Sequence, residues 1–217
     1  MGSFISASDR RIKSNIVDID DDRALRDLRL LKPKTYTYKD FIQKGSTPVY
    51  GFIAQEVKEV LNYASSPITE TVPNVYELAT FSGDILTLAL NTSDLSRDAS
   101  GAVFPKLKLK TRDGKDEFVN ILEIIDAHTL RVDKDLSEWG GELVGDQLGP
   151  GNRIFVYGQE VSDFHTLNKD AIWTVATAAL QEVDRQLQAE KQKTALMQTA
   201  LDALLERVIA LEQKTSV

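Results

Sequence analysis

The C-terminal part of the chain carries a seven-residue repeat of apolar positions. An apolar residue is followed three residues later by a second one, and the alternation continues over about six heptads, which is typical of a coiled coil. The first set of positions is Trp173, Leu180, Leu187, Thr194, Leu201 and Val208, and the second set is Ala176, Val183, Glu190, Met197, Leu204 and Leu211. Glu190 and Thr194 put polar groups in this seam, and such breaks commonly set register and oligomer state at a cost in stability. The mixture of residue types does not choose between a dimer and a trimer.

The middle of the chain has a different pattern, in which short apolar and β-branched runs alternate with clusters of turn residues. The predicted strands are residues 75–78, 85–90, 106–110, 118–125, 129–132 and 153–157. Turns are indicated by Asp113-Gly114, Gly140-Gly141 and Gly149-Pro150-Gly151. Several short strands at this spacing predict a small antiparallel barrel or sandwich.

The N-terminal part mixes both kinds of element. Residues 16–31 form an amphipathic stretch in which the acidic residues 18 and 20–22 precede the helix, where they would cap free N–H groups and favour the helix dipole. Pro33 ends this helix. Residues 35–38 and 49–53 are predicted strands, and residues 54–61 a short helix that buries one apolar side.

The predicted fold class is therefore α+β. It consists of a small N-terminal α/β region, an inserted antiparallel β subdomain and a long C-terminal helix that forms a coiled coil. We place residues 1–7 as an upstream remnant, 8–61 as the α/β region, 62–160 as the inserted β subdomain and 161–217 as the coiled-coil helix.

Composition narrows the class of protein. The 217-residue chain has a net charge of −7, so electrostatic binding to nucleic acid or to an anionic membrane is not expected. It has no cysteine, so disulfides are not expected either. No apolar run approaches the roughly 20 residues of a membrane span. The first residues also lack the pattern of a signal peptide. A soluble intracellular product without a cofactor is expected.

No metal site is predicted either. His128 and His165 have no metal-ligand spacing; His128 is expected to be exposed at a hairpin tip, and His165 lies just before the long helix. Trp139, which stands next to Gly140, is expected to pack within its loop, although stacking on a ligand is the alternative.

One pair of residues has the chemistry of a catalytic dyad. Lys13 follows Ser8 by five positions, and a neutral lysine can activate a serine hydroxyl. Five residues on a helix rotate by about 500°, which leaves the side chains roughly 140° apart. On a strand, an odd spacing puts them on opposite faces. The segment must therefore turn, or the lysine must come from another copy of the chain. By spacing alone, two solvated side chains are the simpler interpretation.

The surrounding motifs favour the catalytic interpretation of Ser8 and Lys13 over two solvated side chains. Residues 8–16 (SDRRIKSNI) resemble the opening motif of the intramolecular chaperone auto-processing domain, the peptidase S74 family. This family comprises the self-cleaving C-terminal modules of phage endosialidases, tail fibres and neck appendages. Residues 30–39 (LLKPKTYTYK) are similar to its Leu-x-Pro-x-x-Tyr-x-Tyr strand, and residues 50–57 (YGFIAQEV) to its Gly-Phe-Ile-Ala-Gln-Glu-Val signature. The resemblance leaves the middle of the chain uncovered.

The resemblance implies a site and an activity. Ser8 and Lys13 would be catalytic in a single-turnover serine endopeptidase that cuts between Ala7 and Ser8. The further motif residues, with a supporting role, are Asp9, Arg11, Gln55 and Glu56. Of these, Arg11 would help to keep Lys13 neutral by like-charge proximity.

The resemblance also implies partners and a setting. The chain would form a homotrimer and would be the C-terminal chaperone of an upstream viral fibre or β-helical protein of the same polypeptide. It would act in the host cytoplasm during virion assembly, and the upstream portion would enter the virion. Neither nucleic acid nor a membrane is an expected partner. The alternative is a non-catalytic trimeric attachment or oligomerisation module of a tail fibre.

Overall fold

The computed structural model describes residues 8–144 and 147–215 of the chain. It divides into two compact units, one made of Met1–Leu31 with Asn168–Val217 and the other of Lys32–Leu167. None of the helices within the described ranges is both long enough and apolar enough to cross a membrane. The predicted boundary between residues 160 and 161 falls inside a strand, and the predicted region 8–61 is divided between the two units at Leu31.

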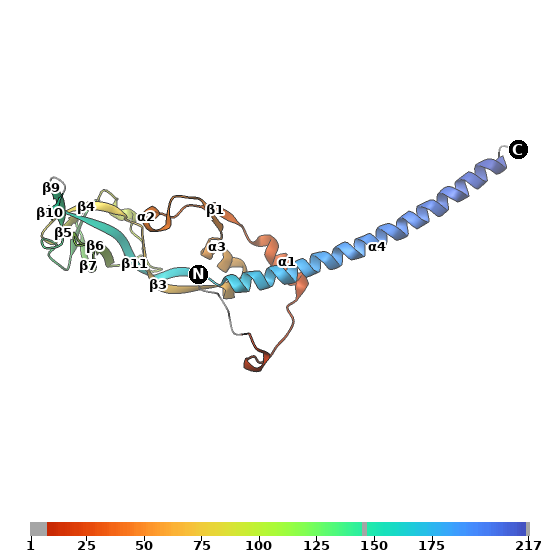
Figure 1. Cartoon of the computed structure of the whole chain (residues 1–217), viewed down its shortest axis with the longest axis horizontal. Helices are drawn as coiled ribbons and strands as arrows, with labels where there is room; N and C mark the ends of the chain where they lie inside the picture. Colours follow the sequence, from red (N-terminus) through yellow and green to blue (C-terminus); the bar gives the residue numbers. More distant parts are fainter. Residues whose placement is uncertain (1–7, 145–146, 216–217) are drawn as a thin grey trace. The chain divides into compact units, whose positions relative to one another are not determined.

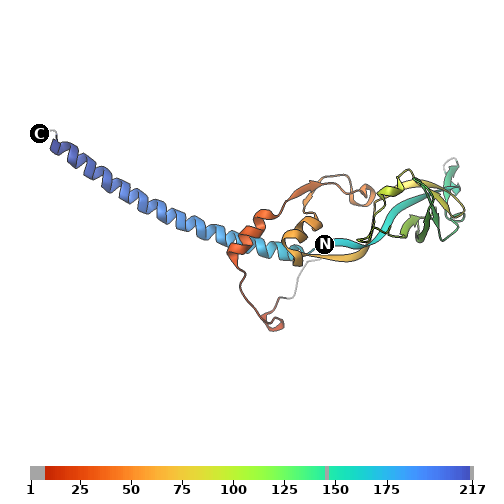
Figure 2. The same cartoon turned by 180° about the vertical axis from the view of Figure 1, so that it is seen from behind.

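The first unit is helical. It contains the 3₁₀ turn η1 (Arg10–Ile12), helix α1 (Asp21–Leu30) and helix α4 (Lys169–Thr215). Helix α1 starts as predicted, because Asp20 caps it by accepting a hydrogen bond of 2.9 Å from the Arg23 N–H. The 47 residues of α4 form one uninterrupted helix, drawn in blue in Figure 1 and from behind in Figure 2.

Helix α1 packs against the N-terminal part of α4. The buried side chains of the two helices are Ala24, Leu25, Ile172, Val175, Ala178 and Ala179. An ion-pair network flanks this contact, since Arg185 bonds Asp21 of α1 and lies 2.8 Å from Glu182 of α4. The helix face that packs within the chain therefore differs from the heptad seam.

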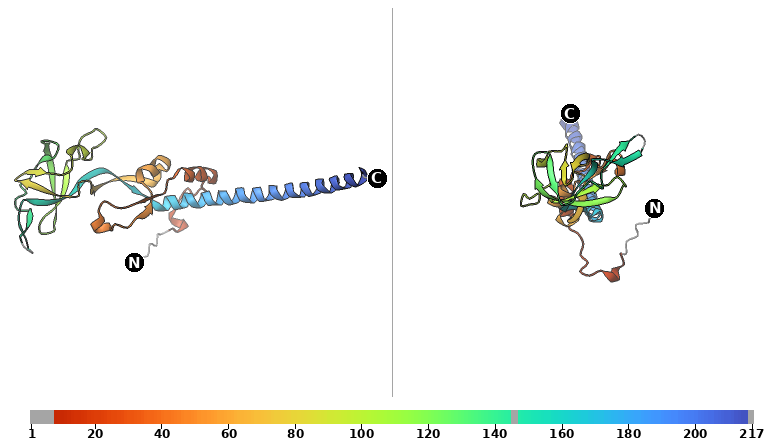
Figure 3. Two further views of the ribbon diagram at one scale, coloured as in Figure 1. Left: turned by 90° about the horizontal axis from the view of Figure 1, so that it is seen from above. Right: turned by 90° about the vertical axis from the view of Figure 1, so that its left-hand side faces the viewer.

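The second unit is built around a closed sheet. Its strands in the described ranges are β3 (Ser65–Val72), β4 (Glu77–Ser82), β5 (Ile85–Thr87), β6 (Lys106–Lys110), β7 (Asp116–Ile124), β8 (Thr129–Val132), β9 (Gly141–Val144), β10 (Gln147–Pro150) and β11 (Arg153–Leu167). Within this part, six strands close antiparallel in the order β11, β4, β5, β8, β7, β6 and back to β11. The right-hand view of Figure 3 shows these strands curving around a common interior. The sequence predicted either a barrel or a sandwich for this region, and the structure forms the barrel.

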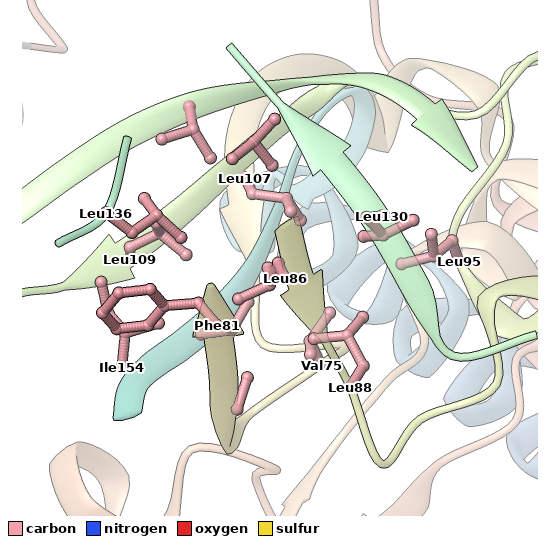
Figure 4. Close-up of a cluster of buried hydrophobic side chains, with 14 residues drawn as sticks. Val75, Phe81, Leu86, Leu88, Leu95, Leu107, Leu109, Leu130, Leu136 and Ile154 are labelled. Atoms are coloured by element: carbon pink, nitrogen blue, oxygen red, sulfur yellow. The ribbon is translucent and has the colours of Figure 1, made fainter. Parts of the chain in front are cut away.

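The barrel interior is filled by aliphatic side chains that alternate with outward-facing residues along each strand. Figure 4 shows Leu86 of β5, Leu107 and Leu109 of β6, Leu130 of β8 and Ile154 of β11 converging on this interior. All five are at most 2% exposed. Trp139 packs against the same core at its rim, with Lys134 5.1 Å above its ring. Loop packing, the simpler interpretation of Trp139, is therefore what the structure shows.

Strand β11 is longer than the predicted run because it takes part in two structures. Its first half lies between β4 and β6 in the barrel, and its second half pairs with β3 as a ribbon. The change happens at a bulge beside Gly158, which has a φ of +154°. A Cβ atom at this position would lie 1.9 Å from the Val72 carbonyl oxygen, so only glycine allows the two chains to approach.

A buried amide next to this bulge ties loops to the barrel. The side chain of Gln159, which is fully buried, accepts hydrogen bonds from Asn74 Nδ2 and the Ser96 N–H, both at 2.7 Å. Its Nε2 donates to the carbonyl oxygens of Phe104 and Ser96 at 2.7 and 3.3 Å. The amide has no unpaired group, as a buried polar side chain requires.

The rest of the second unit consists of short elements. They are β1 (Lys34–Tyr36), α2 (Phe41–Lys44), β2 (Val49–Gly51), α3 (Ala54–Val60), η2 (Asn62–Ala64) and η3 (Thr92–Asp94). Strands β1 and β2 pair antiparallel, and α3 contacts β3 and β11. As predicted, α3 buries one apolar side, with Val57 and Leu61 each 1% exposed.

The loop before α2 is attached to the barrel by one carboxylate. Asp40 accepts hydrogen bonds from the Tyr76 hydroxyl at 2.9 Å, the Tyr157 hydroxyl at 3.0 Å and the Gln43 N–H at 3.0 Å. Burial alone would raise the pKa of Asp40, but these hydrogen bonds outweigh it and hold the pKa below its ordinary value. For Tyr157, burial first and then the hydrogen bond to Asp40 raise the pKa to about 12.

This attachment predicts a loss of stability at high pH. Tyr157 has a folded-state pKa of about 12, above the roughly 10 of an unfolded tyrosine. The folded state therefore binds more protons between these values, and its stability falls as pH rises through this window. Denaturant unfolding at a series of pH values should show this decline, and Tyr157→Phe should reduce it. A Tyr63→Phe control, which changes an exposed tyrosine, should leave the decline intact. An equal slope in all three proteins contradicts the prediction.

Candidate functional site

The segment that carries Ser8 and Lys13 forms a tight turn. Asp9 caps the 3₁₀ turn η1 by accepting a hydrogen bond of 2.8 Å from the Arg11 N–H. The turn closes through the Ile12 N–H to the Asp9 carbonyl at 3.2 Å and the Lys13 N–H to the Arg10 carbonyl at 3.1 Å. An acidic cap is therefore part of the sequence signal that produces this turn.

The turn brings the two candidate catalytic groups together. Lys13 Nζ lies 2.6 Å from Ser8 Oγ and donates a hydrogen bond to it. Both groups belong to one chain, so the turn alone brings them into contact without a lysine from a second copy. The hydroxyl and the amine are within the reach that proton transfer requires. Ala7, the residue expected on the other side of the cleaved bond, lies outside the described residues.

Asp9 and Arg11 hold the turn rather than touch Lys13. The guanidinium of Arg11 donates to both carboxylate oxygens of Asp9, at 3.0 Å from Nε and 2.8 Å from Nη2. The side-chain hydrogen bond from Arg11, followed by its backbone hydrogen bond, lowers the pKa of Asp9. The same contact raises the pKa of Arg11. The charge of Arg11 is thus directed at Asp9.

The whole segment around the dyad is exposed in a single chain. Residues 8–20 include no buried or half-buried side chain, and the red segment runs away from α1 in Figures 1 and 3. Its exposed apolar side chains are Ile12, Ile16, Val17 and Ile19. Ile16 and Ile19, which the predicted amphipathic stretch included, precede α1 in the structure. Four large apolar side chains on 13 consecutive exposed residues form a surface that no other part of the chain covers within residues 8–144 and 147–215.

A second uncovered surface runs along α4. The apolar seam residues that are more than 40% exposed are Trp173, Leu180, Val183, Leu187, Met197, Leu201, Leu204, Val208 and Leu211. A groove of about 910 Å³ lies beside the start of this seam, with Ile19 on one wall and Trp173 and Leu180 on the other. Both surfaces have the apolar character of a contact with another polypeptide.

The second pair of motif residues lies in the other compact unit, on α3. Gln55 is exposed, and Glu56 forms an ion pair of 3.2 Å with Lys34 of β1. The other carboxylate oxygen of Glu56 is buried and has no hydrogen-bond partner among the described residues. Glu56 thus connects the two motifs that carry the sequence resemblance beyond residue 16.

Both histidines form their hydrogen bonds within the second unit. His128 is exposed at the predicted hairpin tip, where its Nδ1 lies 3.2 Å from the Leu90 carbonyl. His165 sits on β11 with Nε2 3.1 Å from Lys58 Nζ and Nδ1 2.7 Å from the Asp163 carbonyl. Sequence reasoning missed the contact between Lys58 and His165, because 107 residues separate them and neither belongs to a recognisable spacing.

Comparison with known proteins supports the resemblance. Residues 8–65 match the sequence model of a peptidase family, S74, described as the chaperone of endosialidase. This confirms the family resemblance for the segment that holds Ser8, Lys13, Gln55 and Glu56. A relative, the uncharacterised protein VP1 of Micromonas pusilla reovirus (isolate Netherlands/2005), is 31% identical over 240 aligned positions that include 93% of this chain. The chain spans only 12% of the length of that viral protein.

The ion pair in the turn predicts how Asp9 titrates. Because Arg11 stabilises the carboxylate, the cap should persist at neutral pH and be lost only when the pH falls below the lowered pKa of Asp9. An NMR titration should place the Asp9 pKa below that of a free aspartate. Arg11→Gln should raise this pKa, whereas Arg10→Gln should change it little. An Asp9 pKa that is the same with and without the Arg11 guanidinium contradicts this account of the turn.

Proposed function

We propose that this chain is a C-terminal intramolecular chaperone that trimerises an upstream viral fibre-type protein and then releases itself by autoproteolysis between Ala7 and Ser8. The observation that carries the proposal is the 2.6 Å hydrogen bond between Lys13 Nζ and Ser8 Oγ inside a segment that matches the chaperone family. It acts in the host cytoplasm while virions assemble. The cleaved fibre passes to the virion without this domain.

The proposed reaction uses the two groups of the dyad in turn. Ser8 Oγ attacks the carbonyl carbon of Ala7, and Lys13 accepts the hydroxyl proton as the general base. The tetrahedral intermediate expels the Ser8 nitrogen, which receives that proton from Lys13. The upstream chain is then held as an ester on Ser8 Oγ. Water hydrolyses the ester, so the upstream product ends in the Ala7 carboxylate and the released domain begins at Ser8.

Assembly would switch this reaction on by removing water. Only a neutral lysine accepts a proton, and exposure to water favours the charged form of an amine. In a single chain the amine of Lys13 and the neighbouring residues 8–20 are exposed. A neighbouring copy that covers Ile12, Ile16, Val17 and Ile19 would bury the turn and exclude water from the dyad. The single chain thus supplies the alignment, and the trimer supplies the desolvation.

The heptad seam supports the trimer. The seam stays exposed because α1 covers a different face of α4. A helix with an apolar stripe of this length is stable in water only when the stripe meets another helix. Three-fold symmetry follows from the family resemblance, and the polar positions Glu190 and Thr194 would set the register of the three helices.

A removable trimer suits the folding of a fibre. Local helical contacts form quickly, whereas the non-local strand pairing of a β-rich fibre is slow and exposed to aggregation. Three aligned coiled-coil helices hold the upstream chains in register during this slow step. Cleavage afterwards removes the trimeriser, so that the fibre is kinetically trapped in its folded form.

The second candidate is a non-catalytic trimeric attachment module of a tail fibre. The observation that favours it is the closed barrel, a complete β fold that the family match at residues 8–65 does not extend to. In this case the domain would stay attached to the upstream protein, and no fragment would appear.

The trimer predicts the effect of charge in the seam. Leu201→Asp combined with Leu204→Asp should dissociate the protein, because each seam position would bury a carboxylate without a partner, at a cost of several kcal/mol per ion. Sedimentation should then give a mass of one third of the original. Gln192→Asp with Thr199→Asp adds the same charge on the opposite, outer positions of the helix and should leave the trimer intact. A wild-type protein that is monomeric at micromolar concentration contradicts the prediction.

The dyad predicts how cleavage responds to substitution. With an upstream segment preceding Ala7, Ser8→Ala should abolish the second fragment, and Lys13→Ala should slow its appearance by about 10²- to 10⁴-fold, as for loss of a general base. Ser14→Ala and Lys39→Ala are matched controls that should cleave normally. Electrophoresis and mass spectrometry give the fragment masses. Efficient cleavage by the Ser8→Ala protein excludes the dyad and leaves the attachment module as the function.

Mixed trimers extend this test to the geometry of the dyad. Because Lys13 reaches Ser8 within one chain, trimers that mix Ser8→Ala chains with Lys13→Ala chains should recover no cleavage. The monomeric Leu201→Asp/Leu204→Asp protein should also fail to cleave, although its dyad is unchanged. Recovery in mixed trimers would show that Lys13 acts across the interface instead.

A further inference from the structure

The outer face of the barrel carries a small hollow that is lined by cations. It has a volume of about 160 Å³, and its walls include Lys110, Arg112 and Arg153 together with the apolar side chains of Leu78 and Phe155. No carboxylate of the described residues lines it. Three cations around one hollow are notable in a chain whose net charge is −7.

Strand pairing explains why these residues meet. Phe155 of β11 lies opposite Leu78 of β4 on one side and opposite Lys110 of β6 on the other. Arg153 and Phe155 flank the buried Ile154, so both side chains point outward from the same face of β11. The hollow is therefore built on barrel strands, which hold its walls more rigidly than loops would.

The cations are unequally neutralised. Lys110 is 3.1 Å from Asp116, and Arg112 is 3.9 Å from Asp113, which is a weak exposed contact. Arg153 is exposed and forms no ion pair with any residue in the described ranges. An exposed guanidinium without an ion-pair partner among the described residues can bind a carboxylate through two parallel hydrogen bonds.

A second hollow, also of about 160 Å³, adjoins the first and shares Lys110 and Phe155 with it. Its walls are aromatic, since Tyr76 packs edge-to-face on Phe155 with ring centroids 5.1 Å apart. The carboxylate of Asp40 also lines it, which disfavours an anion at this end. The pair of hollows therefore suits a ligand with an acidic group at one end and a neutral ring beside Phe155.

We infer that this barrel face binds an acidic saccharide, with the carboxylate of a uronic-acid-type residue held by Arg153 and Arg112 and the adjoining ring packed on Phe155. The carboxylate of such a sugar is attached directly to the ring, so one unit fills the cationic end and covers the apolar wall together. An acidic peptide side chain would leave Leu78 and Phe155 uncovered. Single-stranded nucleic acid needs a basic track along several nucleotides, whereas these cations surround a single small hollow. This site is independent of the proposed autoproteolysis.

The test uses the full chain and a defined oligogalacturonate, followed by isothermal titration calorimetry. We expect saturable binding of the acidic oligosaccharide and none of its fully methyl-esterified form, which keeps the rings and loses the charges. Arg153→Gln should weaken binding by at least tenfold, and so should Phe155→Leu. Arg131→Gln is the matched control: it removes one exposed arginine of the barrel outside this hollow, where Arg131 pairs with Glu123 at 2.7 Å, and it should bind as the unmodified protein does.

Two further arms distinguish other sources of negative charge. Inorganic phosphate at millimolar concentration should not displace the oligosaccharide, and polyuridylate should not bind at physiological salt. Displacement by phosphate, or equal affinity for polyuridylate, overturns the assignment to an acidic saccharide. An absence of oligogalacturonate binding at millimolar concentration overturns it as well, provided that circular dichroism shows each variant folded. Cleavage of the upstream segment should be the same in Arg153→Gln as in the unmodified protein, which keeps this result separate from the proposed chaperone function.

Discussion

The apolar seam of α4 is the constraint on which the rest of this protein depends. A helix of 47 residues can hide one face against α1, and the buried Ile172, Val175 and Ala179 belong to that face. The apolar side chains of the seam from Trp173 to Val208 are exposed to water, which is energetically unfavourable for a stripe of this length. The proposed oligomerisation, timing of cleavage and chaperone activity all rest on this exposed seam.

Local structure aligns Ser8 and Lys13, but it does not bury them. Short-range interactions suffice to align the dyad, because the Asp9 cap and its ion pair with Arg11 form the turn within a few residues. Short-range interactions cannot desolvate it, since residues 8–20 have no side chain buried in their own chain. In the proposed function, local structure aligns Ser8 and Lys13, and assembly then excludes water from them.

Strand β11 connects the barrel of the second unit to the β3 ribbon. It closes the barrel between β4 and β6, changes partner at Gly158 and continues beside β3 to Leu167. Asp40 and Gln159 then fasten loops to this strand through hydrogen bonds that leave their buried polar atoms satisfied. The barrel is therefore integrated into its unit, and its outer face is free to present the cationic hollow.

The sequence alone determined the features that depend on neighbours along the chain. The heptad pattern specified α4, the acidic residues before Arg23 specified the start of α1, and the alternating runs specified β6 and β8 at their observed bounds. The motif at residues 8–16 identified Ser8 and Lys13 as a pair, and the spacing required either a turn or a second copy of the chain. These signals are local, because capping, periodicity and turn formation act over a few residues.

Only the tertiary structure decided the features that depend on distant partners. Strand β3 is polar and contains Pro67, so it has no strand pattern of its own; it is a strand because β11 pairs with it from about a hundred residues further along the chain. The choice of a barrel over a sandwich, the bond between Lys58 and His165, and the placing of Arg112 and Arg153 around one hollow arise in the same way. The physical reason is that strand pairing and burial are energies of contact between segments, and a single segment does not contain the partner that supplies them.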